Sequence, residues 1–282
     1  MTRFGNYRLD IDPGINKDFT RSLAPALRAS ANASSGDPDL RPYCSDTNQW
    51  SLSACAGNAT ADSVEILDAQ DEEYKAAKEG RAKVPIAQLA RLFVYAKARE
   101  LHQDLDKDQG TYISSCFEVL SRFGICTEKL WPYDASKVFV TPSIKALREA
   151  TGHKIHSYYR VHEDGNDRVD AVLLALKAKH PVVFGTLIPS WFSTLRDSNP
   201  VTRPKDNEQT AGGHAMIIVG WSSAKSCFIV KNSWGKAWGD EGYWYMSPEY
   251  LAWESTWDLW VPTRGYAFTK PVDETTVTVI KE

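Results

Sequence analysis

A cysteine, a histidine and an asparagine, far apart in the sequence, could together form a nucleophilic site. Cys55 lies at the start of a predicted helix, His214 opens a predicted strand, and Asn232 stands where another strand ends. A thiol at a helix N-terminus faces free N–H groups and the positive end of the helix dipole, and both favour the thiolate. A nearby histidine could take the thiol proton and later protonate a leaving amine, while an asparagine fixes the tautomer of the ring.

Gln49 could add an electrostatic group to this set, because it lies six residues before Cys55. Its side-chain amide could donate to the oxyanion that develops on a substrate carbonyl, beside the backbone N–H of Cys55. Taken singly, the three other residues have ordinary structural interpretations: a buried cysteine, a hydrogen-bonded histidine and an asparagine turn. Their order and their places at the ends of elements favour a catalytic site.

The elements that must position these residues divide the chain into a helical half and a strand-rich half. Apolar residues with a helical period predict helices over 54–70, 86–105 and 112–123. Short apolar runs predict strands over 181–187, 215–221, 227–231 and 242–246, with a long polar loop over 189–213. Seven of the ten tryptophans lie between Trp221 and Trp260, which predicts an aromatic core there. Helices followed by strands predict an α+β fold with two lobes.

The composition is that of a globular protein and narrows the choice of partners. Of the 282 residues, 43% are hydrophobic, and 33 basic against 36 acidic residues leave no basic excess for nucleic acid. No segment approaches the roughly 18 apolar residues of a membrane span, and the first residues lack the apolar region of a secretory signal. These observations do not assign a cellular compartment.

The five cysteines are too few for a disulfide scaffold, and an odd number leaves at least one thiol unpaired. None of their spacings fits a structural zinc site, so we expect no metal. Cys116 and Cys227 are expected to be buried, whereas a disulfide between Cys44 and Cys126 remains open. The remaining histidines lie in polar or loop contexts and are expected to be solvated: His102, His153, His156, His162 and His180.

Several motifs resemble those of the papain-like cysteine peptidases, in particular a bacterial-type member. The run Lys231-Asn232-Ser233-Trp234-Gly235, with Trp238-Gly239 and Gly242-Tyr243 after it, reads almost residue for residue like the asparagine segment of that family. The likeness covers about residues 38–265 and implies a helical left lobe, a β-barrel-like right lobe and a cleft between them. The other similar segments are Gly213-His214-Ala215, Asp39-Leu40-Arg41, and the stretch from Gly110-Thr111-Tyr112 through Gly124-Ile125 to Trp131-Pro132-Tyr133.

The resemblance implies a role for each matching residue. Cys55 would be the nucleophile, His214 the base and acid, Asn232 the group that orients it, and Gln49 the oxyanion donor. An extended substrate would pair with the backbone near Gly110, next to an S2 pocket that favours a hydrophobic P2 side chain. Trp234 would shield the histidine–asparagine hydrogen bond, and Trp238 would form part of the primed-side wall. The implied substrate-binding residues are Gly110, Thr111, Tyr112, Ile113, Gly185, Gly213, Ala215, Trp234 and Trp238.

The departures from the family pattern cluster around the nucleophile. The family usually has Cys-Gly-Ser-Cys-Trp where this chain has Leu52-Ser53-Ala54-Cys55-Ala56. Leu52 thus removes a half-cystine, Ser53 replaces a glycine that opens the S1 site, and Ala56 replaces a packing tryptophan. Trp50 and Thr111 also stand in place of glycines. None of these changes removes a candidate catalytic group.

We therefore expect a cysteine endopeptidase that forms a thioester acyl-enzyme, needs no cofactor and acts on peptides or proteins as a monomer. One alternative is a catalytically weak homologue that binds peptides or partners, and another is acyl transfer at the same site. The expected organisation is an N-terminal extension over 1–36 and a peptidase domain over 37–282, with a helical lobe over about 45–135 and a strand-rich lobe over about 136–270. The extension either packs along the surface and restricts the cleft, like a propeptide, or forms a tail.

Overall fold

The three predicted helices are confirmed in a computed structural model, which describes residues 17–32 and 36–264. They are α3 (Cys55–Glu79), α4 (Arg91–Leu101) and α5 (Ile113–Arg122). The turn after α5 requires glycine, because Gly124 has a φ of +84° and an added Cβ would lie 1.9 Å from the carbonyl oxygen of Ala150. The other helices are α1 (Phe19–Ser22), α2 (Ala24–Asn32), α6 (Ile144–Ala150), α7 (Gly165–Lys177) and α8 (Pro248–Ala252), with short 3-10 helices at Arg41–Tyr43, Ala135–Lys137 and Phe192–Thr194.

The four predicted strands are also confirmed, within an eight-stranded sheet of order β1-β2-β8-β3-β5-β6-β7-β4. Neighbouring strands are antiparallel except for the parallel pairs β1–β2 and β4–β7. The predicted loop over 189–213 is shorter, because its last part pairs with β3 and starts β5 at Thr210. The strands are β1 (Lys17–Asp18), β2 (Ser157–Val161), β3 (Val182–Pro189), β4 (Pro200–Val201), β5 (Thr210–Ser222), β6 (Cys227–Lys231), β7 (Tyr243–Met246) and β8 (Thr256–Thr263).

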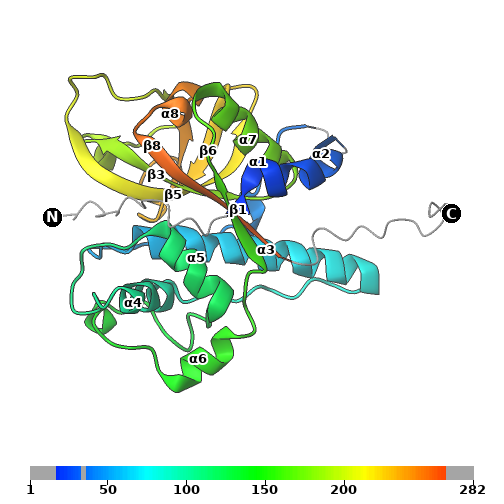
Figure 1. The fold of residues 1–282 in the computed structure, drawn as a ribbon, viewed down its shortest axis with the longest axis vertical. Helices are drawn as coiled ribbons and strands as arrows, with labels where there is room; N and C mark the ends of the chain where they lie inside the picture. The colour runs from blue at the N-terminus through cyan, green and yellow to red at the C-terminus, as the bar shows by residue number, and fades with distance from the viewer. Residues whose placement is uncertain (1–16, 33–35, 265–282) are drawn as a thin grey trace, which may run out of the picture.

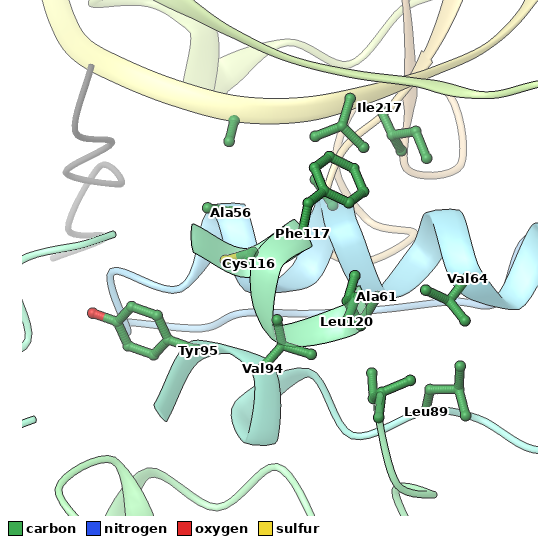
Figure 2. Close-up of a cluster of buried hydrophobic side chains, with 14 of the residues drawn as sticks. Ala56, Ala61, Val64, Leu89, Val94, Tyr95, Cys116, Phe117, Leu120 and Ile217 are labelled. Atoms are coloured by element: carbon green, nitrogen blue, oxygen red, sulfur yellow. The ribbon is translucent and has the colours of Figure 1, made fainter. Parts of the chain in front are cut away.

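The sheet separates two hydrophobic cores, because alternate residues of a strand point to opposite faces. On β5, Ile217 packs in the core formed with α3, α4 and α5, whereas the adjacent Ile218 packs in a core that includes α7. In Figure 2, Phe117 of α5 points toward Ile217 across the boundary between helices and sheet. Figure 1 shows α3 to α6 on one side and the sheet with α7 and α8 on the other, which confirms the two-lobed α+β architecture.

Helix α6 packs with the helical lobe although it follows residue 135 in the sequence. Its Ala146 and Ala150 are buried in the same core as the helices α3 to α5. The close turn at Gly124 brings the chain onto the end of α6, where the Ile125 N–H donates to the carbonyl oxygen of Ala150 over 3.2 Å. Helix α6 thus belongs to the core of the helical lobe, although it lies beyond the lobe boundary expected near residue 135.

Part of the expected N-terminal extension is built into the strand-rich lobe. Residues 17–18 add β1 beside β2, and α2 packs on α7. Phe19, Leu23 and Leu27 are almost fully buried in the core that contains α7. Residues 1–16, 33–35 and 265–282, which complete the expected extension and the C-terminal end of the expected domain, lie outside the described residues.

The cysteines are all free thiols, so the Cys44–Cys126 disulfide that the sequence left open is not formed. Burial of Cys116 and Cys227 is confirmed. The solvated side chain predicted for His180 is wrong, since the turn from α7 to β3 buries this ring and places its Nδ1 3.2 Å from the Pro262 oxygen. Among the described residues, no helix has both the length and the apolar character needed to cross a bilayer.

Candidate active site

Cys55 is the first residue of α3, and its side chain is only 1% exposed. Three backbone N–H groups approach the sulfur and favour the thiolate: those of Ala215 on β5, of Ala56 and of Cys55 itself. Burial nevertheless dominates and raises the pKa of the Cys55 thiol to about 11. In this closed arrangement the cysteine therefore rests as a neutral thiol at the N-terminus of a long helix.

His214 lies on β5 directly before Ala215, whose N–H approaches the sulfur of Cys55. The Nε2 atom is 2.8 Å from Asn232 Oδ1, and the indole of Trp234 stacks on the ring with a centroid distance of 4.8 Å. Nδ1 is buried and has no hydrogen-bond partner among the described residues. Since Nε2 is engaged by Asn232, Nδ1 is the ring nitrogen left to exchange a proton with a substrate or with Cys55.

Burial also controls the protonation of His214, whose side chain is 0% exposed. It lowers the pKa of the imidazole to about 4, although the hydrogen bond with Asn232 opposes this shift. The resting histidine is therefore neutral, like the thiol. A proton that moves from sulfur to Nδ1 would create an ion pair shielded from water, and the N–H groups around Cys55 and the oxygen of Asn232 would stabilise its two charges.

Ser233 connects the asparagine to the candidate oxyanion donor. Its N–H donates to Asn232 Oδ1 over 2.8 Å, and its hydroxyl donates to Gln49 Oε1 over 2.6 Å. The Gln49 side chain is buried and donates one N–H to the Leu52 oxygen over 2.9 Å, which leaves its second amide hydrogen for another acceptor. Sequence reasoning missed Ser233 because a serine after asparagine is most simply a turn residue.

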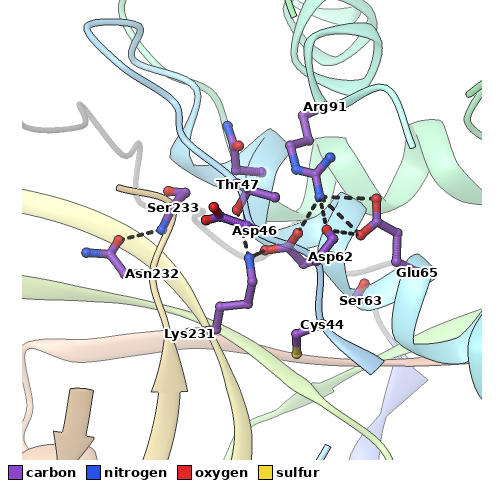
Figure 3. Close-up of polar contacts among 12 residues, drawn as sticks. Cys44, Asp46, Thr47, Asp62, Ser63, Glu65, Arg91, Lys231, Asn232 and Ser233 are labelled. Atoms are coloured by element: carbon purple, nitrogen blue, oxygen red, sulfur yellow. Dashed lines mark hydrogen bonds and ion pairs between the residues drawn. The ribbon is translucent and has the colours of Figure 1, made fainter. Parts of the chain in front are cut away.

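A buried ionic network lies directly beside Asn232 and joins the two lobes (Figure 3). The ammonium of Lys231, at the end of β6, is 2.5 Å from Asp62 Oδ2 and donates to Thr47 Oγ1 over 2.7 Å. Asp62 lies on α3, and its other oxygen accepts from the guanidinium of Arg91 over 2.8 Å. The same guanidinium contacts Glu65 at 3.1 Å, while burial raises the pKa of that carboxyl. The network thus fixes the residue before Asn232 against the helix that begins with Cys55.

The expected substrate strand lies where the chain enters α5. Gly110 is buried with a φ of +80°, and the side chain of Thr111 is buried with no hydrogen-bond partner for its hydroxyl among the described residues. Tyr112 is half-buried, and Ile113, the first residue of α5, is fully buried. Across the site, Gly185 of β3 pairs with Ala215 of β5, and Gly213 pairs with Leu187.

Aromatic side chains build the wall beyond His214. Trp234 lies 5.2 Å from Trp238 and 5.7 Å from Phe192, measured between ring centroids. Trp238 is buried, and its Nε1 donates to the carbonyl oxygen of Phe192 over 3.0 Å. Trp50, by contrast, is 68% exposed beside Gln49 and has a φ of +50°, a conformation that favours the glycine usual at this position.

No group of three or more His, Cys, Asp or Glu side chains within residues 17–32 and 36–264 could hold a metal ion. The groups that the described site does bring together are a thiol, an imidazole, side-chain amides and backbone N–H groups. These groups suit nucleophilic attack on a carbonyl with proton transfer to and from nitrogen.

Comparisons with known proteins agree with this chemistry. The model of the papain family cysteine proteases matches residues 102–252, a range that contains His214 and Asn232 but not Cys55. An uncharacterized peptidase C1-like protein of Acanthamoeba polyphaga mimivirus is 32% identical over 224 residues, which are 77% of this chain and 69% of that relative. The digestive cysteine proteinase 3 of Homarus americanus is 31% identical over 144 residues, or 49% of this chain and 41% of the relative.

Among solved structures, xylellain, a cysteine protease from Xylella fastidiosa, superimposes with a TM-score of 0.76 at 26% sequence identity. The match covers 93% of this chain and 96% of xylellain. The whole described two-lobed architecture, and not the sheet alone, is therefore shared with this bacterial enzyme.

Proposed function

Because the chain belongs to the papain family of cysteine proteases, and is thus a cysteine-type peptidase, we propose that Cys55 is its nucleophile, His214 its acid and base, and Asn232 the orienting group. One observation carries this assignment. The pair His214–Asn232 is hydrogen-bonded over 2.8 Å, and the N–H of the residue after His214 approaches the sulfur of Cys55. These two contacts support a site where the first turn of α3 contacts β5.

The proposed reaction begins when the Cys55 proton moves to Nδ1 of His214. The thiolate attacks the scissile carbonyl carbon, and the negative oxygen accepts hydrogen bonds from the Cys55 N–H and the second amide hydrogen of Gln49. The amine leaves with the Nδ1 proton, so that a thioester remains on Cys55. Water then gives a proton to Nδ1 and attacks the thioester, and the released thiolate takes the proton back as the carboxylic acid departs.

Substrate recognition follows from the strand beside the nucleophile. We propose that an extended peptide pairs with the backbone of Gly110 and Thr111, a mode that leaves side chains free for selection. The small residues Gly185 and Ala215 pair with each other on β3 and β5. We propose that they line the S2 pocket, which would favour a hydrophobic P2 residue. The proposed partners are accordingly peptides or proteins, and the proposed active form is a monomer.

A catalytically weak homologue that binds peptides is the second candidate, and the burial of the site favours it. With Cys55 1% exposed and a thiol pKa of about 11, little thiolate exists near neutral pH in this arrangement. The two candidates differ in one respect: the peptidase must open the site and form the thiolate in the presence of substrate, whereas the binding protein need not.

The test is turnover of internally quenched peptides by Cys55→Ala and Cys55→Ser, with Cys44→Ser as the matched control. Cys44 is a free, half-buried thiol outside the proposed site, so its variant should keep its activity. The Cys55 variants should lose at least about a thousandfold in kcat/KM. Residual activity above this level would show that another nucleophile carries the reaction. A wild-type protein that binds the peptides without cleaving them would favour the second candidate.

A further inference from the structure

A single carboxylate ties the segment that leads to Cys55 to the loop that leads to Gly110. Asp108 Oδ1 accepts from the N–H of Ser53 over 3.0 Å, and Oδ2 lies 3.3 Å from the same nitrogen. In return, the Ser53 hydroxyl donates to the carbonyl oxygen of Asp108 over 3.2 Å. Ser53 is two residues before Cys55 and Asp108 is two residues before Gly110, so the contact joins the nucleophile segment to the substrate strand.

A buried phenol extends this contact to the substrate strand itself. The Tyr95 hydroxyl donates to Asp108 Oδ1 over 2.7 Å and accepts from the Gly110 N–H over 3.1 Å. Tyr95 is fully buried on α4, and its Cβ packs closely against Gly57 of α3, where an added Cβ would lie only 2.9 Å away. The ring therefore has a fixed position between the two helices. One hydroxyl thus links the carboxylate and the glycine at which the substrate would pair.

Arg99 of α4 also contacts the loop that contains Asp108. Its guanidinium lies 4.0 Å from the centroid of the Tyr95 ring and donates to the Lys107 oxygen over 2.7 Å. The loop is therefore anchored on both sides of Asp108 by buried groups of α4. No disulfide joins these two segments, since the five cysteines are free and neither Leu52 nor Ser53 carries a thiol.

We propose that Asp108 is a positioning residue that sets the separation between the Cys55 thiol and the substrate strand at Gly110–Thr111. The proposal rests on the proposed function of Cys55 and adds to it a residue that touches neither the substrate nor the sulfur. Asp108 acts through the two backbone segments that it joins. The contact also accounts for the hydroxyl of Ser53, which donates to the Asp108 oxygen.

The negative charge of Asp108 makes its geometric role separable from an electrostatic one. The carboxylate raises the pKa of the Cys55 thiol, so on charge alone its removal would favour the thiolate. Asn at this position would keep an oxygen that accepts from Ser53 and Tyr95 but would carry no charge. Ala would lose both. A role in positioning therefore predicts that Asn and Ala differ strongly, whereas a role of charge alone predicts that they behave alike.

The experiment compares Asp108→Ala, Asp108→Asn and Tyr95→Phe with Asp106→Ala, an exposed carboxylate of the same loop, as the control. Two reagents report on the two segments: iodoacetamide needs only the Cys55 thiolate, and a peptidyl epoxide also needs the substrate strand. We expect Asp108→Ala to lose between about tenfold and a hundredfold in kcat/KM and in the rate of epoxide labelling, since misplacements near 1 Å have such effects. Iodoacetamide labelling should change by less than about threefold.

Asp108→Asn should retain at least about a third of wild-type kcat/KM. Tyr95→Phe should, like Asp108→Ala, slow epoxide labelling and leave iodoacetamide labelling nearly unchanged. Asp106→Ala should match wild type in all three measurements. Equal losses for Asn and Ala, equal losses with both reagents, or kcat/KM for Asp108→Ala within about twofold of wild type would each overturn the proposal. Tyr95→Phe removes only one hydroxyl, so it tests the link even if Asp108→Ala fails to fold. Failure of the proposed function would appear separately, as cleavage that persists in Cys55→Ala.

Discussion

Replacement of Lys231 by methionine should loosen both the contact between the lobes and the catalytic asparagine next to it. The ammonium is 4% exposed and contacts Asp62, which is 3% exposed, over 2.5 Å. Met fills a similar volume without charge, so Asp62 loses its contact from β6 and Thr47 loses a donor. Because Lys231 directly precedes Asn232, the end of β6 would also lose the bond that fixes it against α3.

The size of the effect follows from what remains around Asp62. Removing one partner of a buried ion pair costs about 3–5 kcal/mol, since an uncompensated charge is left behind. Here Arg91 still contacts the other oxygen of Asp62 over 2.8 Å, so the lower end applies and we expect a loss of about 3 kcal/mol. For a chain of this size, 1 kcal/mol corresponds to roughly 2–4 °C, which predicts a Tm lower by about 6–12 °C.

The assay is denaturant unfolding followed by tryptophan fluorescence, in a Cys55→Ala background that prevents self-digestion. Lys231→Met/Asp62→Asn is the matched comparison, because it removes the two opposite charges together and leaves Arg91 paired with Glu65. This double variant should be at least about 1.5 kcal/mol more stable than Lys231→Met alone. In the active protein, Lys231→Met should lower kcat more than it raises KM. A single variant within about 0.5 kcal/mol of its parent, or a double variant no more stable than the single one, would refute the reasoning.

Three further predictions concern the histidines and the N-terminal segment. His214→Ala should lose as much kcat as Cys55→Ala, and Asn232→Ala about ten- to a hundredfold less, because it orients the base without transferring a proton; equal losses would mean that the roles are misassigned. Burial lowers the pKa of His180 to about 4, below the value near 6.5 of the unfolded chain. The stability that the buried neutral ring contributes is therefore complete above pH 6.5. It is lost as the pH falls toward 4, by up to about 3 kcal/mol. His180→Gln should therefore flatten the decline of Tm between pH 6.5 and 4, and an unchanged slope would contradict this. Deletion of residues 1–36 should lower the Tm because it removes Phe19, Leu23 and Leu27 from a core, at about 1.5–3 kcal/mol each, whereas deletion of 1–16 keeps them. Only the shorter deletion tests whether the extension restricts the cleft, and unchanged kcat/KM in that variant would argue against it.

The fold could be predicted from the sequence wherever one element carries its own pattern. The strands over 182–189 and 227–231 are mostly apolar, because both of their faces are covered by cores. The helix that begins at Cys55 continues to Glu79, nine residues past the predicted end. The sequence did not predict these residues as helical because the charged second half of the helix lacks the apolar period. Phe19, Leu23 and Leu27 do have a helical spacing of four, a signal that would have placed this segment on the domain.

Contacts between distant segments could not be predicted from one sequence. Lys231 and Asp62 are 169 residues apart, and Asp108 and Ser53 are 55 residues apart. Neither pair has a local pattern, since a lysine in a strand and an aspartate in a loop are most often solvated. The roles of these side chains arise only when the two lobes and the α4–α5 loop close around the start of α3.

The places where the chain follows the family pattern, and those where it departs from it, also have a physical reason. The matched family range is 102–252 and does not include the segment around Cys55, where the motif differs from the one usual in the family. In the proposed mechanism, His214, Asn232 and Ser233 must hold exact hydrogen-bond geometry on a sheet, and few residue types can replace an imidazole or an amide there. The segment 49–56 has a looser requirement: it must deliver one thiol and two N–H groups to a fixed point. Packing of Leu52 and Ala56 in the helical core, together with the bond from Ser53 to Asp108, can meet that requirement without the half-cystine, the glycine or the tryptophan that the family usually has.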